Sequence, residues 1–128
     1  MLDQYQEAMT HAARYAPTLP RQEMARAVRE WVNFKMLVRR IMIQVGRVVD
    51  EADEGPAPPP NPPRNFAGWK ATILQLRHCD GVFRRIQQFV NQDLEEFANP
   101  FQQFMSVHTP VLQTVITGLQ GLVTPHNH

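Results

Sequence analysis

The sequence lacks several features that define common protein classes. It has one cysteine, Cys79, so no disulfide can form within the chain, and a small secreted disulfide scaffold is not expected. It has no run of about 18 uncharged apolar residues, which a membrane-spanning helix requires. Its N-terminal residues include carboxylates and no apolar stretch behind a basic start, unlike a signal peptide. We therefore expect an intracellular protein, cytoplasmic or nuclear.

Residues that carry enzyme chemistry are few and unsuitably spaced. The only serine, Ser106, lies two residues from His108, and side chains two apart do not share a helix face. His78 and Cys79 are adjacent and point apart, so we interpret the cysteine as a lone buried one. The histidines lack metal-ligand spacing, and no glycine-rich phosphate loop is present. The sequence therefore predicts no catalytic site, no metal and no cofactor.

The net charge is only +1, but charged residues are distributed unevenly along the chain. Residues 31–49 contain four cations and no carboxylate, and residues 50–54 then supply four carboxylates. Residues 97–128 contain no Asp, Glu, Lys or Arg. An uncharged helix in that last segment is typical of a buried helix or an oligomer interface. It lacks the cations that helices lying in a membrane interface usually carry, so membrane association is not expected.

The length of 128 residues, with 43% hydrophobic residues, is typical of one globular domain spanning 1–128. Six of the 11 prolines lie in the segment 54–64, "EGPAPPPNPPR". Clustered prolines remove backbone donors and favour an extended conformation, so this segment is predicted to be a loop. We interpret it as a stiff connector between helices; the alternative is a ligand for proline-recognising modules.

Helical periodicity covers most of the remaining chain. Apolar residues at three- and four-residue steps predict a short helix over 2–16, and apolar residues every seven positions predict long helices over 20–53 and 65–98. Residues 101–123 are predicted to form a helix that breaks at Pro110. Together these elements predict an all-α fold, a helical bundle with two long helices in an antiparallel hairpin plus a short N-terminal helix and a broken C-terminal helix.

The apolar length of these long helices exceeds what two short helices can cover, which predicts self-association as a homodimer. The residues assigned to this interface are apolar and lie on the predicted second and last helices: Trp31, Val38, Val45, Leu112, Val115, Ile116 and Leu119.

The cations of the two long helices are predicted to line their outer faces. Such an Arg-rich face suits either a phosphate backbone or acidic groups of a protein partner. It is also the ordinary solvated face of a bundle, neutralised by nearby carboxylates. If the two helices pack antiparallel, the cations merge into one basic surface. The candidate binding residues are Arg26, Arg29, Arg40, Arg47, Lys70, Arg77 and Arg84.

Two functional hypotheses follow from these observations. The first is a non-enzymatic, self-associating helical protein that acts through contacts with other proteins, as an assembly, adaptor or regulatory factor. The second is a nucleic-acid-binding protein that contacts a duplex backbone through its Arg-rich face. The second requires that the cations be unpaired and lie on one surface.

Overall fold

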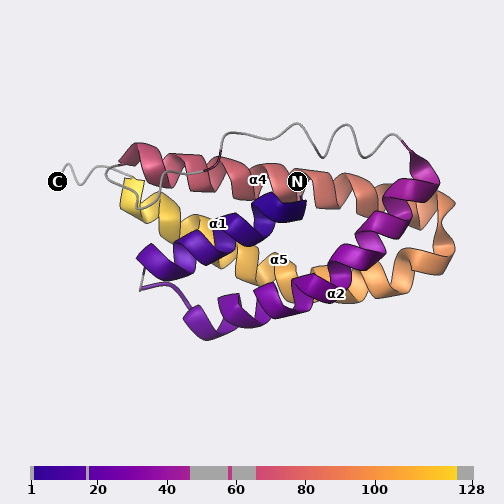
Figure 1. The fold of residues 1–128 in the computed structure, drawn as a ribbon, viewed down its shortest axis with the longest axis horizontal. Coiled ribbons are helices and arrows are strands. Elements are labelled where there is room, and N and C mark those ends of the chain that lie inside the picture. Colours follow the sequence, from indigo (N-terminus) through magenta and orange to yellow (C-terminus); the bar gives the residue numbers. More distant parts are fainter. Residues whose placement is uncertain (1, 17, 47–57, 59–65, 124–128) are drawn as a thin grey trace.

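The computed structural model describes the backbone of residues 2–16, 18–46, 58 and 66–123, and in these residues it contains four helices and no strand (Figure 1). The predicted all-α helical bundle is thereby confirmed. Within the described residues, no helix combines the length and the hydropathy that crossing a bilayer requires. The helices are α1 (Leu2–Tyr15), α2 (Arg21–Val45), α4 (Phe66–Asp93) and α5 (Glu95–Val123).

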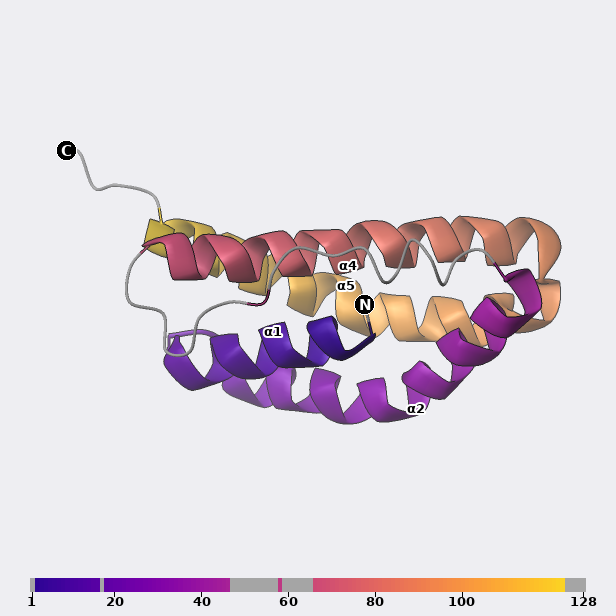
Figure 2. The ribbon, with the colours of Figure 1, turned by 45° about the horizontal axis from the view of Figure 1, so that its top comes forward.

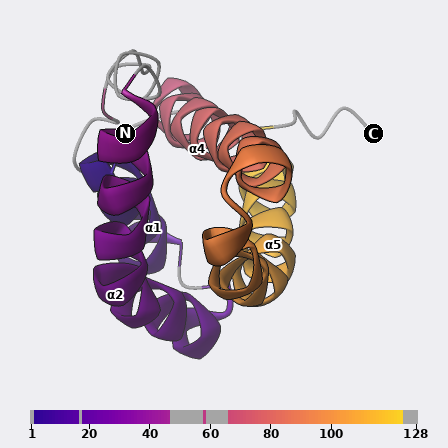
Figure 3. The same ribbon diagram turned by 90° about the vertical axis from the view of Figure 1, so that its right-hand side faces the viewer.

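The four helices form a ring in which each packs on two neighbours. The packed pairs are α1 with α2, α2 with α5, α5 with α4 and α4 with α1. Seen end-on, α1 and α2 form one side of the ring and α4 and α5 the other (Figure 3), and α2 and α4 are not among the closely packed pairs. The longest interface is an antiparallel hairpin of α4 and α5 (Figure 2). The hairpin was predicted instead between the helices that flank the proline-rich segment, but α2 and α4 run in the same direction and do not pack closely.

Helix α2 ends earlier than predicted. It was expected to reach residue 53, but it stops at Val45, and residues 47–53 lie outside the described part. The next residue, Gly46, has φ of +83°, a conformation that residues with a Cβ adopt at a cost. Its amide still donates to the Met42 carbonyl oxygen at 2.7 Å. Glycine therefore provides the C-terminal cap that the seven-residue repeat did not reveal.

The predicted helix over 65–98 is in fact divided between α4 and α5. The chain reverses at Leu94, whose amide donates to the Val90 carbonyl at 3.0 Å and whose carbonyl accepts from the Phe97 amide at 2.9 Å. No glycine or proline marks this turn. A weaker signal was present, because Asp93 followed three residues later by Glu96 is the pattern of a helix start, and carboxylates are favourable in a first turn.

Helix α5 continues through both of its prolines, so the predicted end at Asn99-Pro100 and the break at Pro110 are wrong. Each proline removes one intrahelical donor and leaves the carbonyl four residues earlier without a partner. Those carbonyls belong to Glu96 and Ser106, which are exposed, so water can satisfy them. Burial of one long apolar face outweighs the two lost hydrogen bonds.

The core is centred on Trp31, which is fully buried. Its ring lies 4.7 Å from that of Tyr5 in α1, 5.3 Å from that of Phe83 in α4 and 5.9 Å from that of Phe104 in α5, measured between centroids. Phe34, also in α2, stacks on Phe104. Tilted and stacked aromatic pairs stabilise beyond the area they bury, by about 0.5 to 1.5 kcal/mol each. This aromatic cluster joins all four helices.

Replacing Trp31 with alanine is expected to lower the free energy of unfolding by about 3 to 5 kcal/mol, since it removes the ring that contacts α1, α4 and α5. Urea unfolding followed by far-UV circular dichroism measures this. Met36→Ala, on the exposed side of the same helix, serves as the control and should change stability by less than about 0.5 kcal/mol. Equal losses in both variants would contradict the described core.

Candidate functional site

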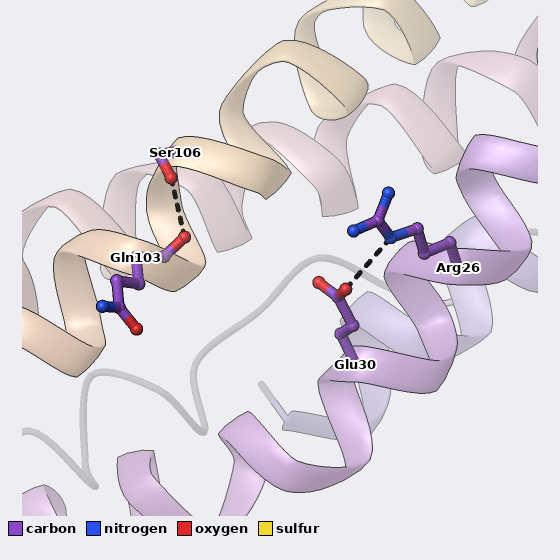
Figure 4. A network of polar contacts seen from close by, with 4 residues as sticks. All are labelled: Arg26, Glu30, Gln103 and Ser106. Carbon is purple, nitrogen blue, oxygen red and sulfur yellow. Dashed lines mark hydrogen bonds and ion pairs between the residues drawn. The ribbon is translucent and has the colours of Figure 1, made fainter.

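The predicted basic residues of α2 differ in their surroundings. Arg26 pairs with Glu30 at 3.1 Å, one turn along the helix (Figure 4). Arg40 lies over the ring of Phe97, 5.4 Å from its centroid. Arg29 is exposed and has no ion-pair partner among the described residues. Arg47 lies outside the described residues.

The basic residues of α4 form a separate group. Lys70 and Arg77 are exposed and have no ion-pair partner in the described part of the chain, whereas Arg84 pairs with Asp80 at 3.1 Å. Because α2 and α4 are not neighbours in the ring of helices, these cations do not join those of α2. The structure therefore presents two basic faces, and the single merged surface that an antiparallel pairing of these helices would have produced is absent from the described residues.

The residues predicted for self-association lie in the core of the single chain, where other helices already cover them. This part of the prediction needs correction, since a buried side chain cannot also form an exposed docking surface. These positions were predicted to be covered by a second copy, whereas in the structure other helices of the same chain cover those that are described. The buried residues are Trp31, Val38, Leu112, Val115, Ile116 and Leu119, and the side chain of Val45 is outside the description.

A different set of apolar side chains is exposed on the outer side of α2. Val32, Met36 and Ile43 are 57%, 67% and 82% exposed, respectively. At about 100° per residue they lie within roughly 40° of one another on the helix surface. Leu74 on α4 and Leu122 on α5 are the other large exposed apolar residues of the described chain, and each stands alone on its helix.

Cations interleave with these apolar residues. Ala25, Arg29, Val32, Met36, Arg39 and Ile43 follow one another at alternating four- and three-residue steps, and all six are exposed. We call these six residues the α2 outer face. Neither arginine has an ion-pair partner among the described residues. The carboxylates of α2, Glu23 and Glu30, lie about 160° and 140° around the helix from the centre of this face.

A shallow groove of about 470 Å³ lies between α2 and α5. Its lining includes Phe34, Leu37, Phe104 and Val107, and its edges are polar and mostly uncharged. Two of its lining residues, Glu30 on α2 and Gln103 on α5, are drawn in Figure 4. The backbone oxygen of Gln103 accepts a hydrogen bond from Ser106 Oγ at 2.8 Å. On α2 the groove is lined by residues such as Glu30 and Leu37, which lie about 120° to 140° around the helix from the centre of the α2 outer face. The groove is therefore a separate surface.

Several polar groups are buried in the core. Tyr5 and His108 share a hydrogen bond in the core, and His11 Nδ1 contacts Thr72 Oγ1 at 3.2 Å. Burial raises the pKa of the Cys79 thiol to about 12, so at neutral pH it is not a nucleophilic thiolate. In the described residues, no three His, Cys, Asp or Glu side chains are placed to hold a metal ion.

No known protein family, curated protein or solved structure matches this chain. The surfaces of the chain are therefore compared by their own chemistry. Of these, the α2 outer face alone in the described chain combines several exposed large apolar residues with unpaired cations.

The buried His108 makes stability depend on pH. Burial lowers its pKa from 6.5 to about 4, so between these values only the unfolded chain binds a proton at this ring. The contribution of neutral His108 to the free energy of unfolding is complete above pH 6.5. It decreases by about 3 kcal/mol as the pH falls towards 4. Chemical unfolding at several pH values should show a flatter dependence in His108→Gln than in the parent. Parallel curves would contradict the assignment.

Proposed function

We propose that this chain is a non-enzymatic helical protein that acts through protein–protein contacts, as an assembly, adaptor or regulatory factor, and that the α2 outer face is its contact surface. The supporting observation is the exposure of Val32, Met36 and Ile43 on one line of one helix. Contiguous exposed apolar residues edged by polar ones are typical of interaction sites. The buried free thiol of Cys79 is compatible with the reducing interior of a cell, cytoplasmic or nuclear, where we place the protein.

The energetics favour a contact of this kind. Covering the side chains of Val32, Met36 and Ile43 contributes about 1.5 to 3 kcal/mol for each one fully buried. Only part of this sum appears as affinity, because association also costs translational freedom and side-chain entropy. The face can therefore support a specific but reversible complex, which suits an adaptor or regulatory factor better than a permanent assembly.

A photo-crosslinking amino acid placed at Met36 tests this proposal in the cells that produce the protein. We expect a protease-sensitive, nuclease-resistant adduct with one recurring protein, whose binding is then reconstituted from the two purified components. The same amino acid at Gln113, exposed on the uncharged side of α5, is the matched control and should give no such adduct. Absence of an adduct at Met36, or equal adducts at both sites, would refute the proposal.

Duplex binding remains a second candidate, because Arg29, Lys70 and Arg77 are exposed and lack ion-pair partners among the described residues. The distribution of these cations weakens the duplex-binding candidate. A straight duplex that contacts the cations of α2 does not also reach those of α4. Few phosphates would then be contacted, and affinity would be low.

Fluorescence anisotropy with labelled duplex DNA and RNA at several salt concentrations separates the two candidates. Contact with Z phosphates makes log K fall against log salt with a slope of about −0.9Z on B-DNA. We expect no measurable binding at physiological salt. Tight binding with a slope equivalent to several phosphates, lost in Lys70→Glu/Arg77→Glu or in Arg29→Glu/Arg39→Glu, would support the duplex candidate and assign it to one helix.

A further inference from the structure

The α2 outer face has the spacing of a coiled-coil seam. Alternating four- and three-residue steps place its six residues in the positions that meet a partner helix in knobs-into-holes packing. The seam extends from Ala25 to Ile43, which is about 27 Å at 1.5 Å per residue. The opposite side of α2 carries Trp31, Val38 and the rest of its buried line. One helix therefore presents two seams, of which the bundle covers only one.

A second copy of the chain is a poor occupant of the exposed seam. In a parallel pair of α2 helices, each residue meets its counterpart, so Arg29 faces Arg29 and Arg39 faces Arg39. In the antiparallel register that joins Val32 to Met36 and Ala25 to Ile43, Arg29 faces Arg39. Both arrangements place like charges opposite each other within the interface, on either side of its midpoint, which is unfavourable.

Membranes and nucleic acids fit the seam less well than a protein helix. The exposed apolar line covers roughly 40° of the helix surface, whereas an amphipathic helix usually buries an apolar stripe of about 100° or more. The line also contains no aromatic residue that could anchor at a lipid interface. A phosphate backbone would use the arginines and leave Val32, Met36 and Ile43 without a partner.

We propose that the α2 outer face binds an acidic amphipathic helix of another protein. Apolar residues of that helix cover Val32, Met36 and Ile43, and its carboxylates lie opposite Arg29 and Arg39. Arg21 and Arg40, also exposed and without ion-pair partners in the described chain, extend the positive field on either side. The partner helix needs about 18 residues to match the full seam. This inference rests on the proposed function and specifies the chemistry of the partner.

Two synthetic 25-residue helical peptides test the inference against the full chain. Both carry Leu opposite the four apolar seam positions; one carries Glu and the other Lys opposite Arg29 and Arg39. Isothermal titration calorimetry at low and physiological salt is expected to show that the Glu peptide binds at least about tenfold more tightly than the Lys peptide. Arg29→Glu/Arg39→Glu should reverse this preference.

Matched variants identify the surface responsible. Lys70→Glu/Arg77→Glu makes the same charge change on α4 and should alter the affinity for the Glu peptide by less than about twofold. Met36→Ser/Ile43→Ser keeps every charge and should weaken binding at least about tenfold, while circular dichroism shows an unchanged fold. An equal loss in the α4 variant would assign the binding to net charge and overturn the inference.

Other outcomes also decide the matter. Equal affinity for the two peptides, or binding of neither while Met36 still cross-links to a protein, would overturn the acidic-helix inference and leave the proposed function standing. Binding of neither peptide together with no cross-link would refute both. The chain could instead bind vesicles of phosphatidylserine and phosphatidylcholine, or duplex DNA, more tightly than the Glu peptide. That result would overturn the acidic-helix inference and assign the α2 outer face to that ligand.

Discussion

The packing of aromatic rings around Trp31 is the constraint on which the rest of the structure depends. Each helix contributes to it: Tyr5 from α1, Phe34 from α2, Phe83 from α4 and Phe104 from α5 all lie within ring-contact distance of Trp31. Aromatic side chains of this size fix the direction from which each helix approaches Trp31. The resulting four-helix arrangement buries the main apolar lines of α2, α4 and α5 within one chain and leaves the outer side of α2 uncovered.

Helix content and burial were predictable because periodicity reports which positions face inwards. In the seven-residue lines through Trp31 in α2 and through Phe83 in α4, the described side chains are buried, apart from the half-buried Trp69. The turns were less predictable. Leu94 reverses the chain without glycine or proline, and Pro100 and Pro110 fail to end α5, because tertiary packing outweighs local preference at all three sites. The seven-residue phase even places Phe97 correctly in the core, although it belongs to a different helix from Phe83.

The candidate surface was predicted only in part. The exposure of Arg29 and Arg40 followed from the helical wheel, since both lie opposite the buried line of α2. The exposure of Val32, Met36 and Ile43 did not, because these residues lie outside the line of apolar positions that repeats every seven residues through Trp31. Apolar character predicts that a side chain will be covered but does not identify what covers it. For Val115 and Leu119 the covering element is the same chain, and for Ile43 it is proposed to be another protein.

The exposed seam also explains why the apolar segment at residues 31–45 contains cations and no carboxylate. Its inner side needs no charge, and in the proposed complex the arginines of its outer side select a partner of opposite sign and disfavour a second copy of the chain. Glu30, the nearest carboxylate, is turned away and paired with Arg26. Stability and specificity thus come from opposite sides of one helix.

The most direct test of this account is the oligomeric state of the purified chain, measured by sedimentation equilibrium over a wide range of concentrations. The account predicts a folded monomer with the mass of one chain, 14.8 kDa, because the core is completed within the chain and the exposed seam opposes self-pairing. A stable dimer that dissociates only on unfolding would contradict it, and would return the self-association hypothesis to first place.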